Sequence, residues 1–135
     1  MAKNKDSAFK TLFLIAAIYD FLLGAIFLFF YKPIYSMFNI VLPAYPMYLQ
    51  MSAAFVFAMG FGYYFIYKNL YRNIDLVKLG IAYKIFYSAW AGYFFFKGIA
   101  HITFFYFVLF DLVFLVFFIM FLKYAKKDAR YLKWK

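Results

Sequence analysis

Residues 104–121 read FFYFVLFDLVFLVFFIMF, an apolar run that is interrupted by a single charged residue, Asp111. Similar runs recur along the chain, and the four apolar segments cover residues 11–30, 48–67, 76–96 and 102–122. A helix of about 20 residues is about 30 Å long, which matches the hydrocarbon core of a bilayer. Because the apolar residues are continuous and do not alternate, we predict helices and not barrel strands.

Composition agrees with this assignment. Of the 135 residues, 70% are hydrophobic and 30% are aromatic, whereas a soluble domain is about half apolar. We therefore predict an all-α membrane protein, a single four-transmembrane-helix bundle covering residues 1–135. The first segment follows a basic start, as in a signal peptide, but its long apolar run lacks a small-residue cleavage site, so we expect a retained helix.

The basic residues predict the orientation of the helices. Three open the chain, three lie near the connection between the second and third segments, and six lie in the tail, whereas the other two connections hold only Lys32 and Lys97. The positive-inside rule then predicts that both termini are cytoplasmic (N-in/C-in). The concentrated basic residues are Lys3, Lys5, Lys10, Lys68, Arg72, Lys78, Lys123, Lys126, Lys127, Arg130, Lys133 and Lys135.

The basic tail, residues 123–135, interleaves its cations with aromatic residues such as Trp134. It is either a helix extension anchored at the lipid headgroups or a surface that docks on a partner. Anionic lipid headgroups are the simplest partner for this charge, and we expect no nucleic acid, because the cations flank apolar spans instead of forming one face.

The first outer connection holds all three prolines of the chain. After Pro33, four apolar residues recur with helical spacing, which predicts a short amphipathic helix on the outer membrane surface; a plain spacer is the alternative. These apolar residues are Ile34, Met37, Phe38 and Val41. At the next outer connection, His101 is expected to be simply solvated.

Charged residues inside membrane segments are rare and suggest a functional role. Three occur here: Asp20, Lys84 and Asp111. Counted from the cytoplasmic ends at ~1.5 Å per residue, they lie about 13, 12 and 16 Å deep. We therefore predict that they form one cluster in the bundle interior.

Stripes of small residues indicate which helix faces pack closely, because backbones approach where side chains are small. Asp20 and Lys84 lie on such stripes, and a third stripe occurs on the second segment. The stripes are Ala16–Asp20–Gly24, Gly80–Lys84–Ser88–Gly92 and Gln50–Ala54–Ala58–Gly62. Five polar residues are expected to support the cluster: Tyr19, Gln50, Tyr83, Tyr87 and Ser88. The cluster is either a static ion pair that fixes helix register, a ligand or partner site, or a site for proton or ion coupling.

From the second segment onward, "GFGYY", "YRNIDLVKLGIAYK" and "FDLVF" resemble a pattern of small bacterial four-helix membrane proteins of unassigned function, some described as DoxX-like. The usual proline before the Arg-Asn pair is replaced by Leu70-Tyr71. The resemblance implies the fold and a bacterial cytoplasmic (inner) membrane. It is carried by Gly62, Tyr63, Arg72, Asn73, Gly80, Lys84 and Asp111.

No catalytic motif occurs: there is no phosphate-binding loop, HExxH motif or serine elbow. The chain has no cysteine and one histidine, so we expect neither a metal nor a cofactor. The favoured function is a non-enzymatic accessory or structural subunit of a larger membrane complex. The alternatives are a small proton- or ion-coupled transporter and a protein that binds lipid or another hydrophobic ligand.

Overall fold

The computed structural model describes residues 2–128 and residue 130. These residues form five α-helices and no strand, so the all-α prediction is confirmed. The helices are α1 (Ala2–Phe29), α2 (Tyr31–Met37), α3 (Pro46–Lys68), α4 (Ile74–Phe96) and α5 (Ile102–Ala125). The long helices extend beyond some of the predicted apolar segments, because polar residues at their ends continue the helical hydrogen bonding.

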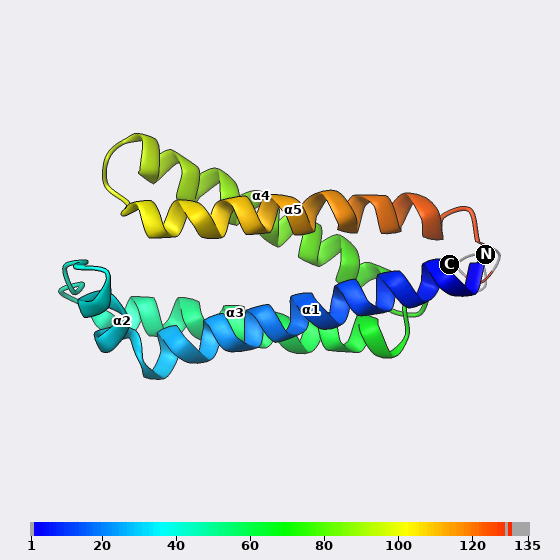
Figure 1. Ribbon diagram of the computed structural model, residues 1–135, viewed down its shortest axis with the longest axis horizontal. Coiled ribbons are helices and arrows are strands. Elements are labelled where there is room, and N and C mark those ends of the chain that lie inside the picture. The colour runs from blue at the N-terminus through cyan, green and yellow to red at the C-terminus, as the bar shows by residue number, and fades with distance from the viewer. Residues whose placement is uncertain (1, 129, 131–135) are drawn as a thin grey trace.

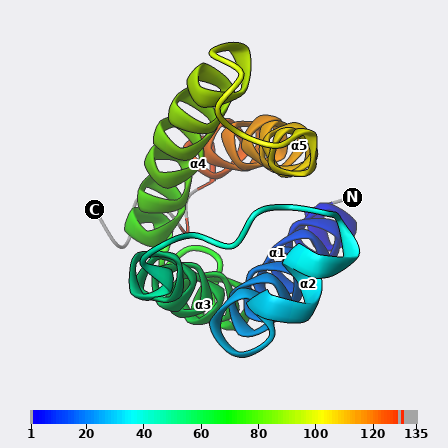
Figure 2. The same ribbon diagram turned by 90° about the vertical axis from the view of Figure 1, so that its left-hand side faces the viewer.

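The four long helices form two antiparallel pairs, α1 with α3 and α4 with α5 (Figure 1). The start of α1, the end of α5 and the α3–α4 connection lie at one end of the molecule, called here the terminal end. Helix α2 and the α4–α5 connection lie at the opposite end, called here the loop end. Figure 2 shows α4 running obliquely across α5 and away from α3. The two pairs therefore differ in how closely their helices run together.

Glycine allows α1 and α3 to pack closely. A Cβ atom on Gly24 would lie 2.6 Å from the backbone nitrogen of Phe57, and one on Gly60 would lie 2.8 Å from the Phe21 ring. Such distances are too short for non-bonded atoms, so a larger residue at position 24 would force the helices apart, and one at position 60 would displace the Phe21 ring. The spacing of the first pair at Gly24 thus requires glycine.

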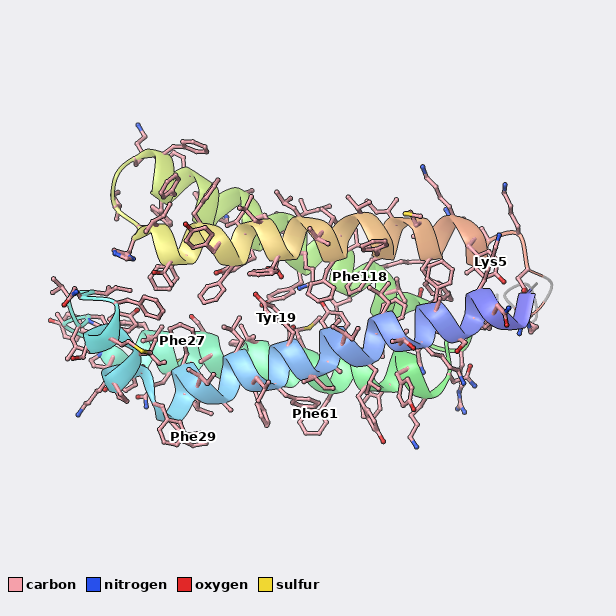
Figure 3. The ribbon with its side chains drawn as sticks, viewed as in Figure 1. Lys5, Tyr19, Phe27, Phe29, Phe61 and Phe118 are labelled. Carbon is pink, nitrogen blue, oxygen red and sulfur yellow. The ribbon has the colours of Figure 1, made fainter. Side chains whose placement is uncertain are left out.

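Aromatic packing joins the two pairs. Near the terminal end, the ring centroids of Phe13 and Phe118 are 4.8 Å apart. Near the loop end, Phe27 packs against Phe107, with centroids 5.9 Å apart. Figure 3 shows Phe27 and Phe118 between the pairs, whereas Phe29 and Phe61 point outward. Large rings thus fill the space between the pairs and also cover the outer surface.

The small-residue stripe predicted on residues 48–67 does not mark a packed face. Ala54 and Ala58 are exposed, and a Cβ atom on Gly62 would meet nothing within 4 Å. The buried face of α3 includes the large residue Tyr63 instead. The physical reason is that close packing needs a small residue on only one of two facing helices: the Tyr63 ring packs against Gly80 of α4.

The short helix predicted after Pro33 is present as α2, and it ends at Met37. Tyr35 is its buried residue, whereas Val41, which we had placed on the same helical face, lies beyond the helix and is 87% exposed. Asn39 has a φ of 53°, a left-handed conformation that asparagine tolerates better than most residues. This turn separates Val41 from the helix.

Three helices are long and apolar enough to cross a membrane: Asn4–Phe29 within α1, Pro46–Lys68 and Ile102–Ala125. Helix α4 has the same length as α3, 23 residues. It is not among the three, because Lys84 and several tyrosines make it less apolar. The prediction of a membrane protein is thus supported at the level of these three helices.

Candidate functional site

Three charged side chains from three helices meet at the centre of the molecule. Lys84 on α4 has its Nζ 2.5 Å from Asp111 Oδ1 on α5 and 3.9 Å from Asp20 Oδ1 on α1. All three residues are at most 4% exposed. We call them the Lys84 cluster. Because α1 belongs to one helix pair and α4 and α5 to the other, the cluster links the two pairs.

The local sequence of α4 explains why Lys84 points inward. Gly80 and Ser88 lie one turn before and one turn after it, and both are buried. A Cβ atom on Gly80 would lie 2.7 Å from the Tyr63 ring, so glycine at this position brings α3 close. Gly92, two turns after Lys84, is also buried, but a Cβ there would meet nothing within 4 Å. The close approach of α4 to α3 is thus confined to the first half of α4.

The cluster is asymmetric. The Lys84–Asp111 pair is a short, charge-assisted hydrogen bond, whereas the 3.9 Å separation from Asp20 is too long for one. Two carboxylates facing one ammonium carry a net charge of −1 when all three are ionised. Asp20 is therefore the carboxylate whose charge Lys84 compensates less well.

Aromatic rings surround the Lys84 ammonium. The rings of Phe114, Tyr63, Tyr83 and Tyr19 have their centroids 5.2, 5.5, 5.5 and 6.0 Å from Nζ. Cations are attracted to the faces of such rings, and the attraction is stronger where water is excluded. In Figure 3, Tyr19 reaches from α1 into the space between the pairs. These rings offset part of the desolvation of Lys84.

Four buried oxygens near the cluster have no hydrogen-bond partner among the described residues. Three belong to the hydroxyls of Tyr19, Tyr63 and Ser88, and the fourth is Oδ2 of Asp20. Buried polar atoms in proteins almost always have a partner, which can be protein or water. The cluster thus has the donors and acceptors to hold a small polar guest such as water, a proton or an ion.

The expected supporting residues are not all at the cluster. Tyr83 contacts Lys84 through its ring, and Tyr87 stacks on Tyr83 with centroids 6.3 Å apart. Gln50 requires a correction: its Nε2 donates a hydrogen bond to the Leu28 carbonyl at 3.1 Å. It therefore ties the start of α3 to the end of α1, because the antiparallel pairing brings these two segments together.

Some of the residues that carry the family resemblance have a structural role in the α3–α4 connection. Asn73 donates from Nδ2 to the carbonyl oxygens of Phe65 and Asn69, at 2.8 and 3.1 Å. The backbone N–H of Arg72 donates to Asn69 Oδ1. These bonds shape the α3–α4 connection, so the Arg-Asn pair helps to turn the chain.

The tail cations have different surroundings. Lys123, Lys126 and Lys127 are exposed, whereas Arg130 is part of a network that we did not predict from the sequence. Lys133, Trp134 and Lys135 lie outside the described residues.

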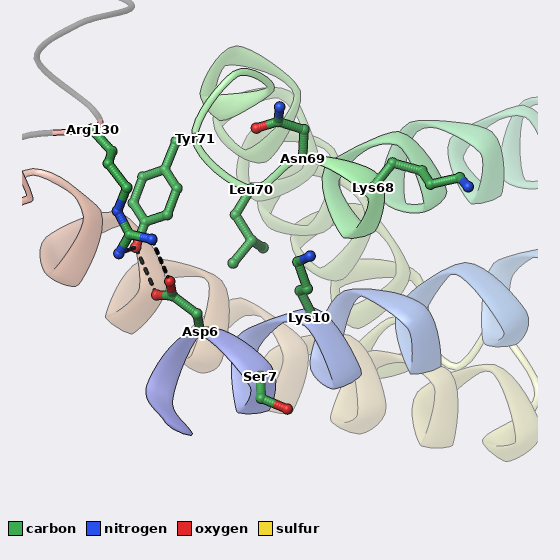
Figure 4. A pocket seen from close by; sticks show the side chains of 8 residues that line it. All are labelled: Asp6, Ser7, Lys10, Lys68, Asn69, Leu70, Tyr71 and Arg130. Atoms are coloured by element: carbon green, nitrogen blue, oxygen red, sulfur yellow. Dashed lines mark hydrogen bonds and ion pairs between the residues drawn. The ribbon is translucent and has the colours of Figure 1, made fainter. Parts of the chain in front are cut away.

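Arg130 connects the first turns of α1 and the segment after α5 to the α3–α4 connection (Figure 4). Its guanidinium donates to Asp6 Oδ2 at 2.7 Å, to Asp128 Oδ2 at 2.7 Å and to the Tyr71 hydroxyl at 3.0 Å. Tyr71 and Tyr124 each donate to Asp6 Oδ1, at 2.7 and 3.2 Å. We call these five residues the terminal network. The one sequence feature that could have indicated this network is the presence of aspartates within two strongly basic segments.

The terminal network shifts the titration of its members. Hydrogen bonds from Arg130 lower the pKa of Asp128 from 3.8 to about 2. Burial, followed by the hydrogen bond to Asp6, raises the pKa of the Tyr71 hydroxyl above its usual range. At neutral pH, Asp128 is therefore ionised and Tyr71 is a neutral hydrogen-bond donor.

Pockets lie in several parts of the described structure, and three of them bear on function. A pocket of about 420 Å³ lies beside the terminal network. An apolar pocket of about 490 Å³ lies along α4, lined by Tyr83, Tyr87 and Trp90 among others. A third, of about 420 Å³, lies between α1, α2 and α5 near the loop end.

His101 has a structural role that we did not expect. Its Nδ1 accepts a hydrogen bond from the Thr103 backbone N–H at 3.3 Å, so it caps the N-terminus of α5. It also lines the pocket between α1, α2 and α5.

No protein-family model, curated protein or solved structure matches this chain. Within the described residues, no group of three or more His, Cys, Asp or Glu side chains could hold a metal ion. The resemblance to DoxX-like proteins therefore stays a prediction.

Proposed function

We propose that the protein spans the membrane four times, through α1, α3, α4 and α5, with α2 lying on the outer surface. Three of these helices have the length and apolarity for it, and α4 is equally long and antiparallel to α5. The terminal end, which carries most of the basic residues, then faces the cytoplasm. The resemblance in sequence supports a bacterial inner membrane.

Within that membrane, the proposed role is a non-catalytic accessory or structural subunit of a larger complex. The observation that carries this proposal is the uncovered stripe of Ala54, Ala58 and Gly62 on α3. Membrane helices associate through small residues, which let two backbones approach. Neither α1 nor α4 covers this stripe, so it is free to pack against a helix of another subunit.

Isolation in mild detergent followed by native mass spectrometry tests this role. We expect wild-type protein to carry a partner subunit and Ala58→Phe to lose it. The matched control is Val113→Phe, which places the same ring at an exposed position on α5 (56% exposed) and should retain the partner. Wild-type protein that purifies alone and monodisperse, or equal retention by both variants, would contradict the proposal.

The second candidate is proton- or ion-coupled transport. It is favoured by the net charge of the Lys84 cluster and by the partnerless oxygens around it. In proteoliposomes, this function requires Asp20→Asn to abolish flux without lowering thermal stability. Loss of flux together with stability would instead favour a packing role for Asp20.

The third candidate is binding of a lipid or another hydrophobic molecule, and the apolar pocket along α4 favours it. Lipid analysis of the purified protein tests this function. A single hydrophobic species retained at a fixed ratio would support it, and Trp90→Ala should then reduce the retained amount. An unselective lipid mixture would count against it.

A further inference from the structure

The pocket beside the terminal network lies between α1, the α3–α4 connection and Arg130 (Figure 4). We propose that this pocket binds a phosphate group. If a membrane lipid supplies the phosphate group, the site rests on the proposed membrane placement. The site does not depend on any partner subunit. Its lining residues are Asp6, Ser7, Lys10, Lys68, Asn69, Leu70, Tyr71 and Arg130.

The charges that line the pocket favour an anion. The lining includes three cations, Lys10, Lys68 and Arg130, and a single carboxylate, Asp6. Asp6 is already paired with Arg130 at 2.7 Å and accepts a hydrogen bond from Tyr71. Among the described residues, Lys10 and Lys68 have no ion pair, so their charges are available to a ligand. With Asp128, which pairs with Arg130 beside the pocket, three cations and two carboxylates leave an excess of one positive charge.

One wall of the pocket is held in place before any ligand binds. Besides its bonds to Asp6 and Asp128, the Arg130 guanidinium lies 4.3 Å from the centroid of the Tyr71 ring. A side chain fixed in this way loses little conformational entropy on binding. The lysines of the lining, Lys10 and Lys68, are exposed, and the Lys68 ammonium lies 5.6 Å from the centroid of the Tyr64 ring.

Neutral donors complete the site. Ser7 and Asn69, which carry a hydroxyl and an amide, both belong to the lining. Asn69 Oδ1 accepts a hydrogen bond from the Arg72 backbone, which leaves its amide N–H groups available to donate. A phosphate group has several acceptor oxygens, and lysine ammonium groups bind it as point charges. Two lysines with neutral donors beside them fit such a group better than a carboxylate.

A phosphate can come from an anionic phospholipid or from a soluble compound, and the experiment separates the two sources. The pocket variant is Lys10→Gln/Lys68→Gln. The matched control is Lys32→Gln/Lys97→Gln, which removes the same charge from exposed residues of the loop end that do not line the pocket. Arg130 is left intact because it holds the terminal network together, and a thermal melt verifies that both variants fold.

In the first arm, the protein is placed in nanodiscs of phosphatidylcholine with or without phosphatidylglycerol, and retained lipid is measured by native mass spectrometry. In the second, inorganic phosphate is titrated into lipid-depleted protein in neutral detergent. We expect the pocket variant to lose on the order of tenfold in affinity, ~1.4 kcal/mol, in at least one arm. The control should stay within about twofold of wild type, because its lysines lie on the open surface.

The arms have distinct outcomes. Loss in the nanodisc arm alone identifies the lipid as the source, and loss in the phosphate arm identifies a soluble phosphate. Equal losses in the pocket and control variants would indicate general attraction to anionic surfaces and overturn the site, as would unchanged binding by the pocket variant. Failure to enter nanodiscs would overturn the membrane placement, and the phosphate arm would then still decide the site.

Discussion

Two cations in this molecule each face a pair of aspartates, in opposite surroundings. Lys84 has a fully buried side chain at the centre, whereas the side chain of Arg130 is 51% exposed at the terminal end. Arg130 reaches both carboxylates at 2.7 Å, but Lys84 reaches Asp111 at 2.5 Å and Asp20 only at 3.9 Å. The better-paired cluster is thus the one nearer to water.

The difference follows from the chemistry of the two cations. A guanidinium is a planar fork that can bind two carboxylates at once, whereas an ammonium is a compact point charge. Exposed ion pairs contribute little to stability, because water already solvates both partners. A buried pair that loses one partner leaves a charge without compensation. Perturbing the Lys84 cluster should therefore have the larger effect.

The largest effect is expected for Lys84→Met, which leaves two buried carboxylates without a counter-charge. We expect a loss of about 3–5 kcal/mol in unfolding free energy, measured by thermal or denaturant unfolding in detergent. The control is Lys97→Met, which removes an exposed lysine near the end of α4 and should change stability little. Equal stability of Lys84→Met and wild type would contradict the importance of the cluster.

The next largest effect on stability is expected to differ between Asp111 and Asp20. Asp111→Asn removes a charge-assisted hydrogen bond and should cost about 1.5–3 kcal/mol. Asp20→Asn should cost less or even stabilise, because it removes the poorly compensated charge at 3.9 Å from Lys84. The same unfolding measurement on both variants compares them. A larger loss for Asp20→Asn would show that Asp20 is the main partner of Lys84.

A smaller effect is expected in the terminal network. Tyr71→Phe keeps the ring under Arg130 but removes the hydroxyl that donates to Asp6 and accepts from Arg130. We expect a loss of ~1 kcal/mol, the usual contribution of one hydrogen bond. Tyr45→Phe, at a residue that is 70% exposed, serves as the control. If both variants unfold alike, the hydroxyl of Tyr71 does not stabilise the network.

The smallest effect concerns pH. Because the folded pKa of Asp128 is about 2, below its ordinary value of 3.8, its pair with Arg130 stabilises the fold above about pH 4. That contribution is lost as the pH falls through about 2. Carbon NMR titration of the Asp128 carboxyl should show its pKa rising toward 3.8 in Arg130→Gln. An unchanged pKa would mean that the pair does not form in solution.

Parts of the fold and of the candidate site could be predicted because they depend on local pattern. Apolar run length located the long helices, and helical spacing placed Asp20 and Lys84 on small-residue faces that the structure buries. The same reasoning failed for Ala54 and Ala58. A small residue permits close packing but does not require it, and here the large Tyr63 fills the contact instead.

The terminal network could not be predicted for a different reason. Asp6 and Arg130 are separated by 124 positions, and no periodicity links residues so far apart. Their charges suggested solvated ends, and the hydroxyl of Tyr71 carried no signal in an aromatic-rich chain. Only the return of α5 to the terminal end brings them together.

The sequence by itself determined that the chain forms long apolar helices, because backbone groups in apolar surroundings must satisfy their hydrogen bonds within the helix. It also indicated that Asp20, Lys84 and Asp111 lie buried in one cluster. The tertiary structure decided which carboxylate Lys84 binds, which face of α3 stays uncovered and how Arg130 joins the chain ends. These depend on the crossing of whole helices, and side-chain distances of a few ångströms are set only when the helices have packed.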